Sequence, residues 1–217
     1  MRHLIAISIV VFLLDGCGNP LPEGDIYQIL IKDQSVEANA SYSQSGWKDD
    51  SGPMNNARLY ECVNPGWQYG HLTISKWSSA EELKSAYNNQ EKPNDRLNRI
   101  YTLEGEVTGN AHDGPDVLYA ITVFNFPREI LGTDEYRPKW DLISDWMKKQ
   151  EGLISARYFE SIPKDVAYRY INVAKWASIK DYYKMLGDAD NFFHTLLEDE
   201  QTKSEALTNI YKLVKEK

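Results

Sequence analysis

Two stretches of the chain follow one pattern, ARLYECVNPGWQYGHLTISKWSSAEELKSA at 57–86 and ARYFESIPKDVAYRYINVAKWASIKDYYKM at 156–185. Aligned at an offset of 99 residues without a gap, they share seven identical residues, where average residue usage gives about two by chance. Self-similarity at a fixed offset is typical of repeated structural units. The sequence therefore predicts two related domains, 25–108 and 115–217, joined by a linker at 109–114.

The second repeat shows the order of its elements most clearly. Strands are predicted where β-branched and aromatic residues cluster, and helices where apolar residues recur at spacings of three and four. These patterns predict strands at 117–126, 154–161, 168–176 and 209–214, a helix around Trp140–Met147 that ends near Gly152, and a helix from Ser178. The order is β-α-β-β-α-β, which is that of the ferredoxin-like fold.

The first repeat is the less regular of the two. Its first strand, Ile26–Ile31, aligns with Val117–Thr122, and 100–103 aligns with 210–213. Between its first two strands, residues 35–56 are rich in Ser, Asn, Gly and Asp. We therefore expect a poor helix or a long loop in that segment.

Both repeats carry the pattern of a capping box at the start of the second helix. Ser178 is followed three residues later by Asp181, and Ser79 is followed in the same way by Glu82. In such a pair the hydroxyl accepts a backbone N–H of the first turn, and the carboxylate reaches back toward the cap. We therefore expect both helices to start at these serines.

The strand at 168–176 has apolar or aromatic residues on both of its faces. One face carries Tyr168, Tyr170, Asn172, Ala174 and Trp176, and the other carries Arg169, Ile171, Val173 and Lys175. Helices on one side of the sheet would leave the second face bare, so that face needs a cover. The natural cover is the other repeat. The expected fold class is α+β, with two tandem ferredoxin-like repeats whose sheets pair into one barrel, and we expect a monomer.

The first 16 residues have the composition of a signal peptide. Arg2 precedes the apolar run Leu4–Leu14, which is too short to span a bilayer. The sequence Leu14-Asp15-Gly16-Cys17 resembles the lipobox of bacterial lipoproteins, in which Cys17 would be lipidated, although Asp15 departs from that pattern. Residues 17–24 would then form a tether, and the protein would be an exported lipoprotein of the cell envelope, at the outer membrane. The alternative is an ordinary signal peptide that is cleaved nearby.

Composition and charge exclude several classes of protein. The formal net charge of -8 argues against nucleic-acid binding, which needs clustered Lys and Arg. Two cysteines cannot build a disulfide scaffold or a Cys-based zinc site, and no His pair has metal-ligand spacing, so no metal site is expected. Cys62 lies in a predicted strand, and we expect a small buried thiol there rather than a reactive nucleophile.

Three stretches of the second repeat, Gly152–Arg157, Tyr170–Ser178 and Tyr119–Asn125, share a pattern of strand and turn residues. In this pattern the repeat resembles the antibiotic biosynthesis monooxygenase (ABM) domain. The resemblance covers nearly all of 115–197 and extends more faintly to the first repeat. It implies an α+β barrel built from two domains, usually in a homodimer. Some members of the family oxidise quinols or polyketide-derived aromatics with oxygen and no bound cofactor, and others bind haem and degrade it.

The resemblance also implies site residues in the second repeat. Asn125 matches an Asn that faces the substrate in the haem-degrading branch, and His194 matches the His that ligates iron there. Tyr168, Tyr170 and Asn172 are expected to line a cleft between sheet and helices, where a hydroxyl and an amide orient a phenol or quinol. The alternatives are a strand-end Asn, a surface His and ordinary core packing.

Two tryptophans occupy equivalent strand ends in the two repeats. Trp77 and Trp176 are expected to be shared core anchors, because each buries a large apolar area. The first repeat has Asp95 and Gln34 where the second has its candidate His and strand-end Asn. We therefore expect the first repeat to be structural, with one working cleft in the second.

Two functions remain open at this stage. The first is an ABM-like monooxygenase that takes an aromatic, quinol-like or haem-like substrate in the cleft of the second repeat, with haem or with no cofactor. The haem-degrading branch also uses a Trp further along the helix, and residues 182–186 contain none, which argues against haem breakdown. The second function is that of a non-catalytic envelope lipoprotein whose barrel binds a ligand or another protein.

Overall fold

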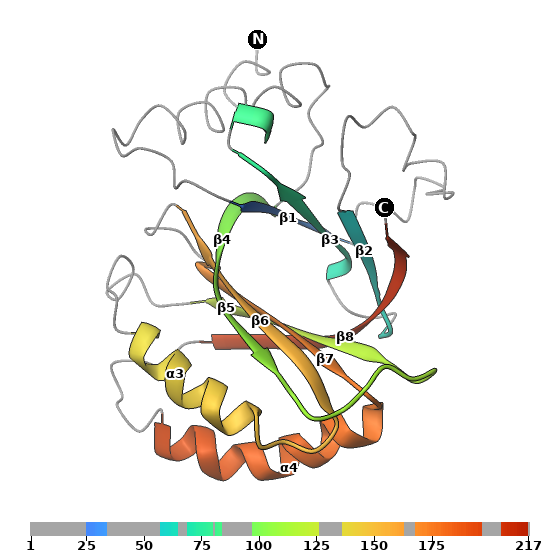
Figure 1. The fold of residues 1–217 in the computed structure, drawn as a ribbon, viewed down its shortest axis with the longest axis vertical. Coiled ribbons are helices and arrows are strands. Elements are labelled where there is room, and N and C mark those ends of the chain that lie inside the picture. Colours follow the sequence, from blue (N-terminus) through green and yellow to red (C-terminus); the bar gives the residue numbers. More distant parts are fainter. Residues whose placement is uncertain are drawn as a thin grey trace.

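The structure is a computed structural model that describes residues 25–33, 57–64, 69–79, 81–83, 97–125, 136–162, 168–196 and 205–216. Its strands form a closed barrel of eight, and two helices pack outside the barrel (Figure 1). The elements are β1 Ile26–Asp33, β2 Ala57–Cys62, β3 Tyr69–Trp77, β4 Leu97–Thr108, β5 Leu118–Asn125, α3 Tyr136–Met147, β6 Leu153–Ser161, β7 Tyr170–Trp176, α4 Ile179–Leu196 and β8 Glu205–Glu216.

The strand order around the barrel has two matching halves. In the first half the strands are ordered β4-β1-β3-β2, and in the second half β8-β5-β7-β6. Antiparallel pairing of β2 with β8 and of β6 with β4 closes the ring. The expectation that the sheets close into a barrel within one chain is therefore confirmed.

The register of the first strands corrects the alignment made from the sequence. Ile26 lies opposite Trp77 in the first half, and Leu118 lies opposite Trp176 in the second. Ile26 therefore matches Leu118, one residue away from the alignment of Ile26 with Val117. The short apolar segment offers two neighbouring registers, and only the pairing with the Trp-containing strands decides between them.

The barrel interior is filled by side chains and is rich in tyrosine. Alternate residues of each strand point inward, so that odd-numbered residues of β5 join those of the neighbouring strands. The buried members are Tyr27, Ile29, Tyr60, Cys62, Leu72, Ile74, Tyr101, Tyr119, Ile121, Val123, Phe159, Ile171, Val173 and Tyr211. The side chains thus form the core expected of a small closed barrel.

Helices α3 and α4 cover the outer face of the second half (Figure 1). Trp140, Ile143 and Met147 recur at spacings of three and four along α3 and are buried. Tyr182 and Met185 do the same along α4. This periodic apolar stripe makes each helix amphipathic and joins both helices to the sheet in one hydrophobic cluster.

The caps expected from the sequence are present at both helix starts. The backbone N–H of Asp181 donates to Ser178 Oγ at 3.2 Å, and Ser178 Oγ donates to Asp181 Oδ2 at 2.6 Å. The backbone N–H of Glu82 donates to Ser79 Oγ at 3.1 Å. Its carboxylate reaches one residue further back than predicted and accepts hydrogen bonds from the backbone and side chain of Ser78.

In the second repeat, two strands differ from their predicted bounds by two residues or more. β7 begins at Tyr170 rather than at Tyr168, because Tyr168 has a φ of 60° and leaves the extended conformation. β8 extends over 205–216 and is longer than the predicted 209–214.

Several predicted features lie outside the described residues. They include the signal peptide, Cys17, the tether, residues 35–56, Gln34 and Asp95. No helix within the described residues is long and apolar enough to cross a membrane.

Candidate functional site

The outer face of the second half carries an interrupted hydrophobic surface. Along β7, Tyr170, Ala174 and Trp176 belong to the cluster under the helices, and Asn172 takes the alternate position between them. The sequence predicted this alternation. A polar residue on this face is unusual, because its neighbours along the strand are apolar and buried.

Asn172 belongs to a row of polar side chains that crosses the sheet. In register, Tyr158 of β6 lies beside Asn172, Asn172 beside Thr122 of β5, and Thr122 beside Thr208 of β8. The hydroxyl oxygens of Thr122 and Thr208 are 2.8 Å apart and share a hydrogen bond. Asn172 Oδ1 is buried and has no hydrogen-bond partner among the described residues. A buried acceptor without a donor costs about 1–3 kcal/mol, which makes this atom suited to receive a donor from a ligand.

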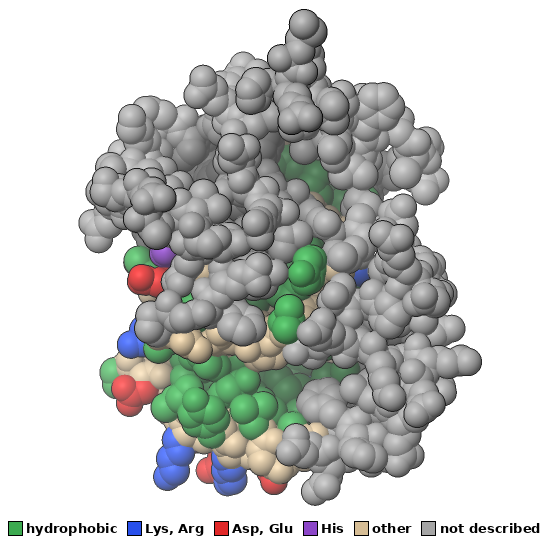
Figure 2. Space-filling view, turned by 180° about the vertical axis from the view of Figure 1, so that it is seen from behind, with side chains coloured by type: hydrophobic (Ala, Val, Ile, Leu, Met, Phe, Trp, Pro, Cys, Tyr) green, Lys and Arg blue, Asp and Glu red, His purple; other side chains and the backbone are tan. Residues whose placement is uncertain are grey.

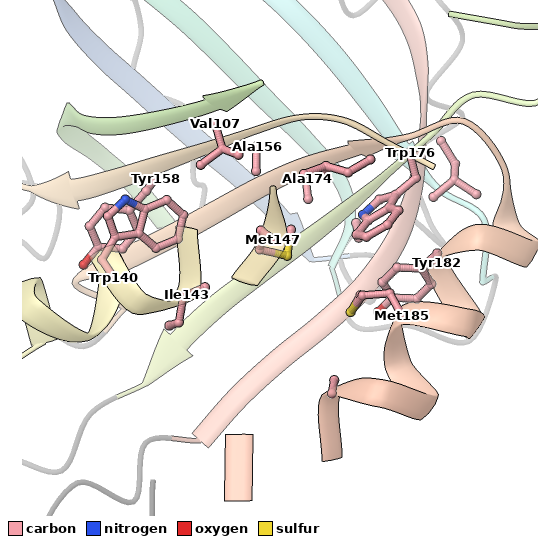
Figure 3. Packing of buried hydrophobic residues seen from close by; sticks show 14 of the residues in the cluster. Val107, Trp140, Ile143, Met147, Ala156, Tyr158, Ala174, Trp176, Tyr182 and Met185 are labelled. Atoms are coloured by element: carbon pink, nitrogen blue, oxygen red, sulfur yellow. The ribbon is translucent and has the colours of Figure 1, made fainter. Parts of the chain in front are cut away.

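A stack of aromatic rings borders the polar row. The Trp140 and Tyr158 rings are stacked with centroids 4.1 Å apart, and the Tyr158 and Tyr170 rings are stacked at 5.3 Å, both with interplanar angles of 16°. Figure 3 shows Trp140 of α3 lying against Tyr158 of the sheet. All three rings are buried and stack on one another, so they form an aromatic border beside Asn172.

Next to the polar row, on its Trp176 side, the sheet surface is made of small residues. Ala120, Ala174 and Ala156 lie side by side on β5, β7 and β6. They are buried in the cluster that also holds Met147 and Met185 from the two helices (Figure 3). Small side chains on the sheet let the helices approach closely, so this part of the face is core.

An ion pair lies at the end of the same face where β6 ends and β7 begins. Glu160 Oε1 accepts hydrogen bonds from Nε and Nη2 of Arg169, at 2.8 and 2.5 Å. The guanidinium carbon of Arg169 lies 4.8 Å from the centre of the Tyr170 ring. A buried charge therefore contacts one end of the aromatic stack.

The hydrophobic surface continues outward over the helix layer. Figure 2 shows hydrophobic side chains gathered in the lower half of the molecule, with charged side chains along its lower edge. Among the side chains that the structure describes in α3 and α4, the exposed large hydrophobic ones are Leu142, Ile179, Tyr183 and Leu186.

The structure brings together part of the predicted site. Tyr170 and Asn172 lie on the same face of β7, under the helix layer. Asn125 ends β5, opposite Glu205, and His194 lies in the last turns of α4. The side chains of Asn125 and His194 lie outside the described residues, so their role stays a prediction.

Of the two roles considered for Tyr168, the structure shows core packing. Its side chain packs against the interior cluster of the barrel, away from Tyr170. The positive φ of Tyr168 interrupts the alternation that would have placed the two tyrosines on one face. Trp176 and Trp77 are buried at 0% and 2% exposure, as expected of core anchors.

Four members of the site were missed from the sequence. Thr122 and Tyr158 lie directly beside Asn172, Thr208 lies beside Thr122, and Trp140 stacks on Tyr158. The helical spacing identified Trp140 only as a core residue. The others become neighbours of the site through the register of paired strands. Pairing the predicted strands 154–161 and 168–176 residue by residue is the signal that would have placed Tyr158 beside Asn172.

Cys62 behaves as the sequence predicted. Its side chain is buried in the barrel interior, and its thiol lies 3.5 Å from the carbonyl oxygen of Asn64. Burial raises the pKa of the Cys62 thiol above its usual value, so the nucleophilic thiolate is disfavoured. Within the described residues, no group of His, Cys, Asp and Glu has the arrangement of a metal site.

No protein-family model and no curated protein matches the sequence. Solved structures do match the fold. An anthrone oxidase-like protein is 14% identical with a TM-score of 0.64, and the match covers 90% of this chain and 93% of that chain. A candidate monooxygenase from Fusobacterium nucleatum is 9% identical with a TM-score of 0.59, covering 91% and 95%. A ferredoxin-fold protein from Listeria monocytogenes related to antibiotic biosynthesis monooxygenases is 12% identical with a TM-score of 0.48, covering 89% and 96%. At these identities the likeness is one of fold.

Proposed function

We propose that the protein is an ABM-like monooxygenase that oxidises a flat phenol, quinol or anthrone in the cleft of its second half. The observation that carries this proposal is the buried Oδ1 of Asn172, which has no hydrogen-bond partner in the part of the chain that the structure describes and lies beside the Tyr158 and Tyr170 stack. An acceptor next to parallel aromatic faces suits a substrate that has both a flat ring and a hydroxyl donor. The fold likeness to an anthrone oxidase-like protein supports the same substrate class.

The proposed chemistry needs only molecular oxygen as co-reactant. For an anthrone, the ring methylene becomes a carbonyl that contains one oxygen atom of O2, and the other atom leaves as water. For a hydroquinone the reaction is an oxidation without oxygen insertion, in which two electrons and two protons pass to O2 and give the quinone and hydrogen peroxide. Asn172 would accept the hydrogen bond of the substrate hydroxyl, and Tyr170 would hold the ring.

The arrangement of the barrel supports a duplication in which the second half carries the site. The two halves share a strand order, and each has a tryptophan, Trp77 or Trp176, as the last residue of the equivalent strand. The first half has Thr73 at the place of Asn172 and Leu59 at the place of Tyr158. These two positions of the first half thus carry neither the amide nor the aromatic ring, so we propose a structural role for this half. Because the barrel closes within one chain, we also propose that the protein is a monomer.

Oxygen consumption tests the proposed function. Initial rates are measured with an oxygen electrode on a panel of anthrones, hydroquinones and phenols, for the wild type and for Asn172→Ala and Tyr170→Leu. Tyr183→Leu, on the exposed side of α4, is the matched control. Substrate-dependent uptake that falls in both site variants and stays unchanged in the control supports the proposal. Uptake at the background rate with every substrate contradicts it.

Haem is the second candidate ligand. It rests on the resemblance and on His194, since the described residues of the cleft include no His side chain. A Soret titration of wild type and His194→Ala decides the matter. Saturable binding that the variant loses supports a haem site on α4, and no binding removes haem from the candidates.

The alternative function is a non-catalytic envelope lipoprotein. Saturable binding of a flat phenol without any oxygen uptake would favour it. Export and lipidation at Cys17 are a separate proposal, carried by the N-terminal sequence. Membrane fractionation of the wild type and Cys17→Ala tests it, since the variant is expected to leave the membrane fraction.

A further inference from the structure

Arg169 and Glu160 form an ion pair that is almost fully removed from solvent. The two residues are 1% and 8% exposed; Arg169 directly precedes β7, and Glu160 lies near the end of β6. Desolvation of two charges is expensive, and a buried ion pair is often no more stable than a packed apolar pair of the same volume. Stability alone therefore does not account for this pair.

The backbone around Arg169 is held in an uncommon conformation. Tyr168 has a φ of 60°, which is a strained conformation for a bulky residue. The Tyr101 hydroxyl donates to the Tyr168 carbonyl at 3.1 Å, and the Ser161 N–H donates to the Arg169 carbonyl at 2.7 Å. These bonds fix the entry into β7 and with it the position of the Arg169 side chain.

The ion pair is in contact with the candidate site. The Arg169 guanidinium carbon lies 4.8 Å from the centre of the Tyr170 ring, and Tyr170 stacks on Tyr158. A guanidinium is planar and packs flat on an aromatic face, while its N–H groups remain free to bind a carboxylate. Glu160 takes two of those N–H groups and so fixes the plane of the guanidinium.

We propose that Arg169, held by Glu160, is a positioning residue that sets the Tyr170 ring beside Asn172. This proposal rests on the proposed function for its effect on turnover, but it has a structural consequence of its own. The Tyr170 ring stacks on Tyr158, and the Tyr158 ring stacks on Trp140. A displacement of the Tyr170 ring is therefore expected to displace the Trp140 indole as well.

The test compares Arg169→Lys with wild type in protein that contains 5-fluorotryptophan. The variant keeps the charge and loses the planar fork. The Trp140 resonance, assigned with Trp140→Phe, is read by fluorine NMR, and kcat and KM are measured with the phenol that the wild type oxidises best. Arg157→Lys is the matched control, because Arg157 pairs with Glu106 of β4 at 2.7 Å and both side chains of that pair are partly exposed to solvent.

Arg169→Lys is expected to shift the Trp140 resonance and to lower kcat/KM by about 10- to 100-fold, the scale on which misplacement of a reacting group acts. Arg157→Lys is expected to change neither. In a Tyr170→Leu background, Arg169→Lys is expected to add no further loss, because its effect passes through the Tyr170 ring.

Two outcomes would overturn the proposal. One is an unchanged Trp140 resonance in Arg169→Lys. The other is an equal, additive loss of kcat/KM in the Tyr170→Leu background. Because Arg169→Met can fail to fold, the double variant Glu160→Met with Arg169→Met is included; it is expected to keep the far-UV circular dichroism and still move the resonance. If the wild type oxidises no phenol, the proposed function fails, and the fluorine resonance alone decides the positioning role.

Discussion

Gly105 of β4 and Trp140 of α3 fit together so closely that a Cβ atom on the glycine would lie 2.4 Å from the indole Nε1. The absence of a side chain on the strand lets the indole reach the sheet and stack on Tyr158. The aromatic border of the candidate site therefore depends on a glycine of the first half of the barrel.

Gly105→Ala is expected to destabilise the protein by about 1–3 kcal/mol, the usual range for overpacking a closely packed core. It should also reduce substrate-dependent oxygen uptake, because Trp140 must move away from Tyr158. Urea unfolding measures the free energy of unfolding. Gly187→Ala is the control, since a Cβ there meets nothing within 4 Å and removal of a glycine from α4 should stabilise the helix by up to about 1 kcal/mol. Equal stability of the two variants would contradict the close fit.

Asn172→Leu tests whether the Asn172 amide serves the stability of the fold or the binding of a ligand. The leucine side chain branches at the same carbon as asparagine, so it has a similar shape. The substitution removes the buried Oδ1 acceptor, which has no hydrogen-bond donor among the described residues. The free energy of unfolding is expected to stay the same or rise by about 1 kcal/mol, because an unsatisfied polar group is removed. Chemical denaturation provides the measurement. A loss of several kcal/mol would mean that the amide holds the fold together, and the assignment of Asn172 to ligand binding would fail.

Tyr60 is expected to make the protein sensitive to alkali. Burial in the barrel raises the pKa of its hydroxyl to about 12, from an ordinary value of 10.0. The folded state thus retains a proton that the unfolded chain loses above pH 10. Stability is complete below pH 10 and falls by about 2–3 kcal/mol as the pH rises toward 12. Unfolding curves from pH 8 to 12 should be flatter for Tyr60→Phe than for wild type, and parallel curves would refute the assignment.

Ser178→Ala is expected to destabilise the protein by about 1 kcal/mol through the loss of the cap on α4. The side chain bonds both the backbone N–H and the carboxylate of Asp181. Ser178→Thr keeps the hydroxyl and is expected to lose much less. Thermal unfolding of the three proteins measures the difference, and a threonine variant as unstable as the alanine variant would argue against capping.

The sequence was a good guide to the fold because its signals were local. Alternation along 168–176 and helical spacing at Trp140–Met147 placed these elements within a few residues of their observed bounds. The repeat at 57–86 and 156–185 led to the barrel, since two sheets with apolar outer and inner faces must cover each other.

The site was less predictable because it depends on pairing between distant strands. Thr208 fell just outside the predicted last strand, so its contact with Thr122 could not be expected. The left-handed backbone at Tyr168 has no signal in a side chain that usually favours extended structure. That one dihedral angle turns Tyr168 inward, away from the outer face on which Tyr170 lies.

The most direct test of the account is an equilibrium binding titration with an anthrone under nitrogen, so that no turnover occurs. Wild type, Asn172→Leu and Thr73→Val are compared by calorimetry, the last being the matched substitution in the first half. The account predicts a single site whose affinity falls by about 10- to 100-fold in Asn172→Leu, the value of one lost buried hydrogen bond, and stays unchanged in Thr73→Val. Equal affinity in all three proteins, or no binding to the wild type, would contradict it.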